Sequence, residues 1–84
     1  MRITFHRKFK KNIKKQPRKV QIKFKKRYKL FKKDQFHHSL NNHALKGKYY
    51  GIRSINITGD IRAHYLEDDG GVIFLDIGDH SDLY

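Results

Sequence analysis

Four side chains in the second half of the chain could together perform acid-base chemistry on a phosphodiester. Histidine exchanges protons near neutral pH, and a carboxylate is an alternative base. An arginine can stabilise the negative charge that builds on a reacting phosphate. An RNA strand can be cut without a metal when a base removes the 2′-hydroxyl proton and an acid protonates the leaving 5′ oxygen. The candidates for these roles are His43, Asp60, Arg62 and His80.

These residues can act together only if the strands predicted for this region bring them to one place. Residues 50–58, 60–67 and 71–77 are rich in Ile, Tyr, Val and Phe, as strands are. The links between them contain Gly59 and Gly70, in turns that tolerate positive φ. The region is therefore predicted to form an antiparallel meander. Its last segment is almost wholly apolar, which suits a central strand.

Alternation along the middle segment predicts a polar face. Side chains of a strand point to opposite faces in turn, so Ile61, Ala63 and Tyr65 are expected on the core side and Arg62 and His64 on the other. The residues expected on or beside this polar face are Asn56, Arg62, His64, Asp79, His80, Asp82 and Tyr84.

Charge is distributed unevenly along the chain. The 84 residues carry 20 Lys and Arg against 8 acids, and residues 1–33 hold 16 of the basic residues and no acid. A chain this basic is expected to bind a polyanion, with nucleic acid as the first choice and an anionic membrane surface as the lesser one. The predicted RNA-binding residues are Lys10, Lys14, Lys23, Lys26, Arg27, Lys46, Arg53 and Asn56.

The basic half also shows the spacing of two amphipathic helices after a short strand at residues 1–5. Phe5, Phe9 and Ile13 recur every four residues, and Pro17 separates them from a second apolar stripe that begins at Val20, as expected for two consecutive helices. We predict an α+β fold in one domain, residues 1–84. A strand and a two-helix hairpin pack on a twisted antiparallel sheet of about four strands.

Several classes of protein and site are disfavoured. The chain contains no Cys, which excludes disulfides and thiolate metal sites. No signal peptide or membrane span is recognisable, so a cytoplasmic location is expected. His37, His38 and His43 lie in a polar stretch, residues 34–48, that is expected to form a loop. They lack a carboxylate at ligand spacing, so neither a metal nor a cofactor is expected.

The layout resembles the RelE/ParE superfamily of bacterial toxins, and in detail its YafQ-type branch of ribosome-associated mRNA interferases. The most specific match is the C-terminal motif at residues 78–84, GDHSDLY. The weaker matching positions are His43, Ala44, Leu45, Lys46, Gly47, Arg53, Ile57, Asp60 and Tyr65.

The resemblance implies an endoribonuclease toxin that cuts mRNA on the translating ribosome. It implies proton-transfer or orienting roles for His43, Asp60 and His80. It also implies an aromatic at Tyr84 that can stack on an mRNA base. The arginine at position 62 is a feature more typical of RelE and HigB toxins, in which an arginine at this point faces the scissile phosphate. The implied partners are an antitoxin, ribosomal RNA and mRNA, with a toxin that is monomeric when free and part of a larger complex with antitoxin.

Alternatives remain open from the residues. Asn56 and Ile61 stand where the YafQ branch has a histidine and a tryptophan, so the general base could be Asp60, His43 or His80. A ParE-like inhibitor of gyrase and a non-catalytic RNA- or DNA-binding protein are the competing functions. Structural roles are also conceivable: a polar loop residue, a turn cap, an ion pair with Glu67 or Asp76, a tie to the sheet, or core packing. In this order, these roles would apply to His43, Asp60, Arg62, His80 and Tyr84. No role is expected for His64.

Overall fold

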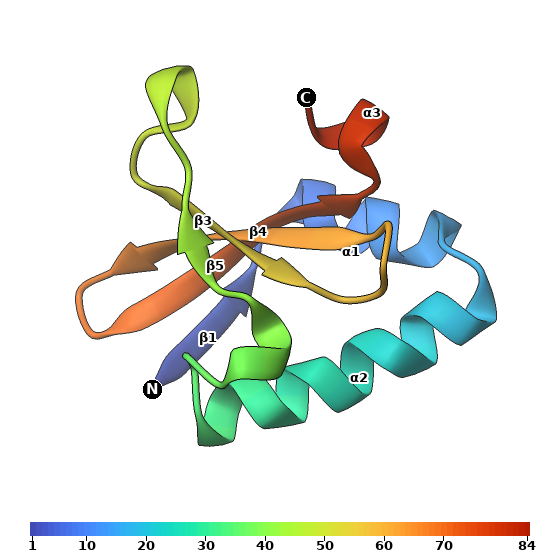
Figure 1. Ribbon diagram of the computed structural model, residues 1–84, viewed down its shortest axis with the longest axis horizontal. Helices are drawn as coiled ribbons and strands as arrows, with labels where there is room; N and C mark the ends of the chain where they lie inside the picture. The colour runs from blue at the N-terminus through green and yellow to red at the C-terminus, as the bar shows by residue number, and fades with distance from the viewer.

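The computed structural model describes all residues, 1–84, as a mixed sheet with two long helices and one short one (Figure 1). The strands are β1 (Arg2–Phe5), β2 (His43–Ala44), β3 (Ile52–Asn56), β4 (Arg62–Asp68) and β5 (Gly71–Gly78). The helices are α1 (Arg7–Lys15), α2 (Arg18–Lys33) and α3 (His80–Leu83), and single-turn 3-10 helices span His38–Leu40 and Gly47–Tyr49. No helix has the length and apolar composition needed to cross a membrane.

The sheet confirms the predicted α+β class and meander but has five strands rather than four. Its order is β1-β5-β4-β3-β2. Strands β3, β4 and β5 are antiparallel, as predicted, whereas β1 is parallel to β5 and places Phe5 opposite Phe74. The predicted loop at residues 34–48 contributes the fifth strand, because His43 and Ala44 pair with Ser54 and Arg53 of β3.

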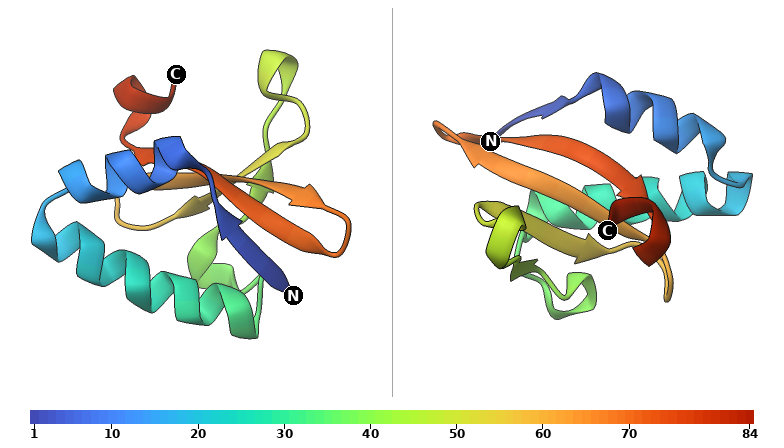
Figure 2. Two further views of the ribbon diagram at one scale, coloured as in Figure 1. Left: turned by 180° about the vertical axis from the view of Figure 1, so that it is seen from behind. Right: turned by 90° about the horizontal axis from the view of Figure 1, so that it is seen from above.

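The two long helices form the expected hairpin, which both views of Figure 2 show beside the sheet. Helix α1 ends before Gln16, whose backbone is extended, because the residue before a proline is disfavoured in the helical region. Pro17 is the N-cap of α2, as its fixed φ allows. Phe9 and Ile13 of the first predicted stripe lie on α1 and the second stripe lies on α2, but Phe5 belongs to β1 and not to the first helix.

A cluster of aromatic rings joins the helices to the sheet. Phe74 of β5 is fully buried, and its ring centroid lies 5.6 Å from that of Phe5, 5.7 Å from that of Phe9 and 5.3 Å from that of Phe31. Tyr65 of β4 is also fully buried and packs edge-on against Phe31 at 5.0 Å. This core fixes the face of β4 that carries Ala63 and Tyr65, so that the opposite face is left for polar side chains.

The two hairpin turns differ in how well the sequence predicted them. Asp69 (φ 37°) and Gly70 (φ 78°) form a two-residue turn between β4 and β5, the pairing of left-handed residues that tight hairpins require. The turn between β3 and β4 is longer than predicted, because β4 begins at Arg62 and not at Asp60. Here Thr58 Oγ1 accepts hydrogen bonds from the backbone N–H groups of Asp60 (3.3 Å) and Ile61 (3.0 Å).

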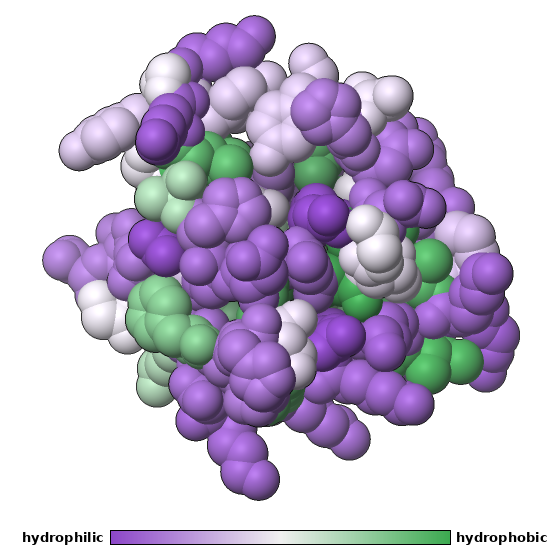
Figure 3. Space-filling model, viewed as in Figure 1, coloured by the Kyte–Doolittle hydropathy of each residue, from purple (hydrophilic) through white to green (hydrophobic).

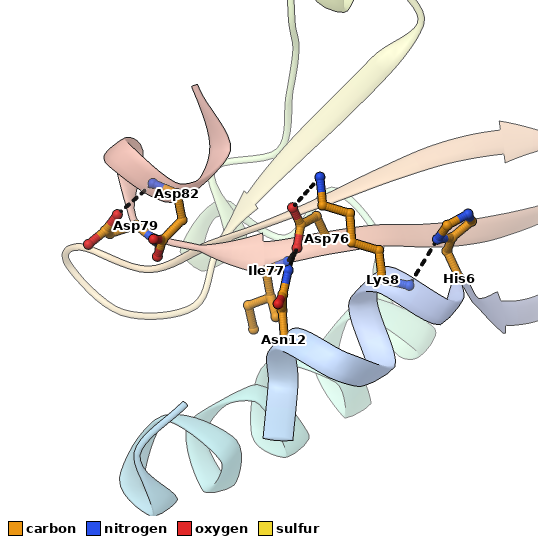
Figure 4. A network of polar contacts seen from close by, with 7 residues as sticks. All are labelled: His6, Lys8, Asn12, Asp76, Ile77, Asp79 and Asp82. Carbon is orange, nitrogen blue, oxygen red and sulfur yellow. Dashed lines mark hydrogen bonds and ion pairs between the residues drawn. The ribbon is translucent and has the colours of Figure 1, made fainter. Parts of the chain in front are cut away.

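Polar contacts tie strand β5 to its neighbours at two places (Figure 4). The carboxylate of Asp76 accepts a hydrogen bond from Asn12 Nδ2 at 2.6 Å and forms an ion pair with Lys8 Nζ at 3.4 Å, which links β5 to α1. At the end of β5, Asp79 and Asp82 cap α3 reciprocally through their side chains and backbone N–H groups. Helix α3, which the sequence did not predict, is thereby fixed next to β5.

Candidate active site

One cleft, with a volume of about 260 Å³, brings together all five residues that the sequence predicted to be catalytic. They come from β2, the β3–β4 turn, β4, α3 and the C-terminus, so no local segment could have formed the site alone. The lining residues are His43, Ser54, Gly59, Asp60, Arg62, His80 and Tyr84.

The strand register explains why these residues converge. His43 of β2 lies opposite Ser54 of β3, and Ser54 lies opposite His64 of β4. One step along the same face, Arg62 of β4 lies opposite Gly78 of β5. Helix α3 begins two residues after Gly78, at His80, so its side chains stand beside Arg62.

His43 is exposed, and its ring is held by the backbone of Asn41. Its Nδ1 lies 2.9 Å from the carbonyl oxygen of Asn41, a residue in the left-handed conformation with φ 46°. A carbonyl oxygen can only accept, so Nδ1 carries the hydrogen and Nε2 has a free lone pair when the ring is neutral. The geometry thus presents His43 in the tautomer that can accept a proton from a substrate.

Arg62 is oriented by the β3–β4 turn. Its Nη1 lies 3.0 Å from the carbonyl oxygens of both Thr58 and Gly59, and 3.4 Å from that of Ile61. The predicted alternative, an ion pair with Glu67 or Asp76, is wrong, because no such contact forms and Asp76 is bound to α1. One edge of the guanidinium is therefore fixed in the turn, and its charge is not neutralised by any carboxylate.

Asp60 lies in the same turn and is exposed. Its carboxylate makes neither a hydrogen bond nor an ion pair, because Thr58 Oγ1 satisfies the backbone N–H groups of the turn. The alternative role as a turn cap therefore belongs to Thr58. Asp60 is left as a free carboxylate beside Arg62 in the cleft.

Tyr84 is the centre of an aromatic cluster at the other side of the cleft. Its ring centroid lies 4.8 Å from that of His80, 5.1 Å from that of Tyr49 and 5.2 Å from that of His64. The side chain is 45% exposed, so the alternative role in the core is wrong. Part of the ring remains open to a ligand.

His64, to which the sequence gave no role, holds the hydroxyl of Tyr84. It is 4% exposed, and its Nε2 lies 2.9 Å from Tyr84 Oη. Burial lowers the pKa of His64, an effect that Asp76 opposes and His43 reinforces. Burial and the neighbouring Tyr49 raise the pKa of Tyr84, against the opposing effects of Arg62 and Ser54. Near neutral pH the phenol is therefore protonated and the imidazole neutral.

A signal for His64 was present in the sequence, since alternation placed it on the face of Arg62. Its partner could not be recognised, because Tyr84 is 20 positions away and outside any strand. Ser54 was expected to point away from the core but was given no role; its Oγ is buried beside the cleft.

The predicted RNA-binding residues do not form one surface. Lys23, Arg27 and Asn56 line a second groove next to the cleft, whereas Lys10 and Lys14 border an apolar groove between α1 and α2. Lys26 and Lys46 are exposed. Figure 3 shows that hydrophilic residues dominate the face seen there, with small and separate hydrophobic areas.

Arg53, another predicted RNA-binding residue, lies on the face of the sheet opposite the cleft. It is opposite Tyr65 in the register, so it shares the core face. Its Nε donates to Asn42 Oδ1 at 2.8 Å, and its guanidinium lies 5.3 Å from the centroid of the Phe36 ring. The alternation rule applied to β3 would have grouped Arg53 with the buried Ile55 and away from Asn56.

No group of three or more His, Asp or Glu side chains is arranged so that it could hold a metal ion. His37 and His38 stack on each other with centroids 4.4 Å apart, and His37 Nδ1 accepts from the backbone N–H of Ser39 at 3.1 Å. The histidines of residues 34–48 thus serve local structure, except for His43 in the cleft.

The fold has clear relatives among solved structures, while no curated protein matches the sequence. A copper-bound mutant toxin from Helicobacter pylori is 28% identical with a TM-score of 0.78, over 100% of this chain and 99% of that chain. YafQ from E. coli strain BL21(DE3) is 20% identical with a TM-score of 0.85, over 99% and 97%. YafQ in the E. coli DinJ-YafQ toxin-antitoxin complex is 21% identical with a TM-score of 0.82, over 99% and 96%.

The family model for YafQ, the bacterial toxin of type II toxin-antitoxin systems, matches residues 1–84. The match confirms the resemblance seen in the C-terminal motif, whose His80 and Tyr84 are in the cleft. The chain therefore belongs to the YafQ family of bacterial toxins of type II toxin-antitoxin systems.

Proposed function

We propose that this toxin is an mRNA interferase, an endoribonuclease that cuts mRNA on the translating ribosome and so inhibits translation. The observation that carries the proposal is the convergence of two histidines, a carboxylate and an arginine on one cleft that is large enough for a phosphodiester and its neighbouring atoms. Acid, base and charge stabiliser are the three parts that metal-independent RNA cleavage needs.

In this proposal His43 is the general base. Its free Nε2 removes the proton from the 2′-hydroxyl, and the oxygen then attacks the adjacent phosphorus. Arg62 stabilises the charge on the phosphate, and His80, in its protonated form, donates a proton to the leaving 5′ oxygen. The products are a 2′,3′-cyclic phosphate and a 5′-hydroxyl end. Asp60 accepts a hydrogen bond from the ribose and orients it.

Tyr84 would bind the message rather than transfer a proton. Its hydroxyl is bonded to His64, and its phenol has a raised pKa, so it is a poor acid for the leaving group. The exposed part of its ring can stack on a base next to the cut, and base stacking on an aromatic side chain contributes about 1–3 kcal/mol.

The charge distribution supports the ribosome as the place of action. The chain has 20 Lys and Arg and a single ion pair, between Lys8 and Asp76. Nearly all of its cations are therefore free to contact ribosomal RNA, with each phosphate contact releasing counterions.

The same basic surface also suggests a protein partner of the opposite charge. E. coli YafQ has been crystallised with the antitoxin DinJ, and we propose an acidic antitoxin that covers the basic face of this monomeric toxin in a larger complex.

Cleavage on translating ribosomes tests the function. Wild type, His43→Ala and His80→Ala are compared on one defined message, with His38→Ala as the matched control outside the cleft. Loss of a general acid or base lowers rates by about 10²–10⁴, so we expect such a loss for the two cleft variants and a wild-type rate for the control. Mapped ends should carry 5′-hydroxyl groups.

Two results would contradict the proposal. Equal cleavage by all four proteins would remove the histidines from the reaction. Uncut transcripts with accumulated DNA breaks after induction in cells would instead indicate a gyrase inhibitor. Circular dichroism of each variant tests whether misfolding is the cause of any inactivity.

A further inference from the structure

A second groove, with a volume of about 850 Å³, lies beside the catalytic cleft. It runs between α2 and the β3–β4 turn, and its size falls within the range of roughly 300 to 1,000 Å³ that is typical of small-molecule sites. Gly59 and Asp60 line both this groove and the cleft, so the two spaces share a wall. The remaining lining residues are Lys19, Val20, Lys23, Arg27, Ser39, Asn56, Thr58, Ile61 and Asp79.

The helix side of the groove is cationic. Lys19, Lys23 and Arg27 are spaced by four residues, which places them on one face of α2. Lys23 and Arg27 are partly buried, unlike Lys26, and none of the three is paired with a carboxylate. Like charges at this spacing repel each other, and the carboxylates of Asp60 and Asp79 on the other wall form no ion pair with them, so the helix side of the groove can bind an anionic ligand.

Two residues that line the groove, Arg27 and Asn56, each have a side-chain polar atom without a partner. Arg27 Nε and Asn56 Oδ1 are buried from solvent and make no hydrogen bond. Buried polar groups are rarely left unsatisfied, and each exception calls for an explanation. One atom is a donor and the other an acceptor, so a ligand that satisfies both must accept one hydrogen bond and donate another.

A nucleotide meets these requirements better than an acidic peptide side chain does. Its phosphate pairs with the lysines and with Arg27, and its ribose hydroxyl or base amine can donate to Asn56 Oδ1. A carboxylate side chain can only accept and would leave Asn56 unpaired. Because Asp60 lines both spaces, the groove is adjacent to the place where the cleaved phosphodiester would bind, and an RNA strand could extend from the cleft into it.

We propose that the groove between α2 and the β3–β4 turn holds the message nucleotide next to the cleaved bond, with its phosphate on Lys23 and Arg27 and its sugar or base on Asn56. This inference rests on the proposed function, because it takes the neighbouring cleft as the cutting site. The proposed site divides the basic residues of α2 into two groups. Those in the groove hold the message, and those on the opposite side of α2 are available to ribosomal RNA.

Site-directed crosslinking tests the placement without relying on activity. The chain has no native Cys, so Ser39→Cys introduces a unique thiol in the groove while leaving its charges intact. This variant carries a short photo-crosslinker in a His80→Ala background and is bound to ribosomes with a defined message. Lys29→Cys, which lines none of the pockets described above, is the control.

We expect Ser39→Cys to crosslink to the message, within a few nucleotides of the position that wild type cuts, and Lys29→Cys to give no such product. Crosslinks from Ser39→Cys only to ribosomal RNA, or none to RNA, would overturn the inference. So would crosslinks only to the antitoxin when both it and programmed ribosomes are present. If wild type proves inactive but the message is still crosslinked at Ser39→Cys, the proposed function fails while the groove as an RNA site stands.

Charge removal gives a second, kinetic test. Lys23→Gln/Arg27→Gln is compared with Lys25→Gln/Lys29→Gln, which removes the same charge from the opposite side of α2. We expect the groove variant to need at least tenfold more toxin for half-maximal cleavage than the control variant does. An equal shift in the two variants would show that only net charge matters and would refute the site.

Discussion

Replacing Arg62 separates the two roles that its position gives it. One edge of its guanidinium is bound to the turn through Nη1, and the other atoms of the group are free to face the cleft. Arg62→Gln removes the charge, and Arg62→Lys keeps a charge but cannot reproduce the planar fork. Loss of the charge should therefore affect the reaction, and loss of the Nη1 contacts should affect the stability of the turn.

The size of each effect follows from the contacts. Nη1 has two N–H groups, so it can make two good hydrogen bonds, those of 3.0 Å, while the contact of 3.4 Å is weak. Two such bonds at a partly exposed site contribute about 1–2 kcal/mol to the free energy of unfolding. Removing one preorganised charge stabiliser lowers a rate by about 10²–10³.

Both quantities can be measured on the same proteins. Cleavage under single-turnover conditions on ribosomes gives the rate, and urea unfolding gives the stability. We expect Arg62→Gln to lose about 10²–10³ in rate and Arg62→Lys to lie between it and wild type, with similar losses of stability in both. A folded Arg62→Gln protein that cuts within threefold of the wild-type rate would refute a role for this charge in the reaction.

Three further predictions concern residues behind the cleft. Tyr65→Phe removes a buried hydroxyl that accepts hydrogen bonds from two side-chain amides; it should lower the urea midpoint by an amount equivalent to about 1–2 kcal/mol, and an unchanged midpoint would contradict this. Burial lowers the pKa of His64, so the unfolded chain takes up this proton first as pH falls below about 6.5, and stability is lost from there towards the lowered pKa. His64→Leu should show a smaller loss of unfolding free energy between pH 7.5 and 5, and an equal loss would show that other groups control it. Gly78→Ala places a Cβ 2.6 Å from Asp82 Cβ; it should displace α3, cost about 1–3 kcal/mol and reduce cleavage, so full activity in this variant would argue against the fixed position of α3.

The main helices and strands and the charge of the molecule follow from local patterns in the amino-acid sequence. Four-residue spacing of apolar side chains predicts both long helices, and the extended residue before Pro17 ends the first of them. Alternation in β4 correctly separates the buried Ala63 and Tyr65 from Arg62. These signals are local, because helix and strand periods and the backbone limits of Pro and Gly act within a few residues.

The way in which distant segments meet depends on the folded chain as a whole. The parallel pairing of β1 with β5, the two-residue strand that presents His43 and the four-residue helix that carries His80 are too short or too distant to have a periodic pattern. The contact between His64 and Tyr84 depends on where that helix ends against the sheet. Long-range pairing is selected by burial of the whole core around Phe74, and this is why residue types indicated the chemistry while the shape of the cleft came from the fold.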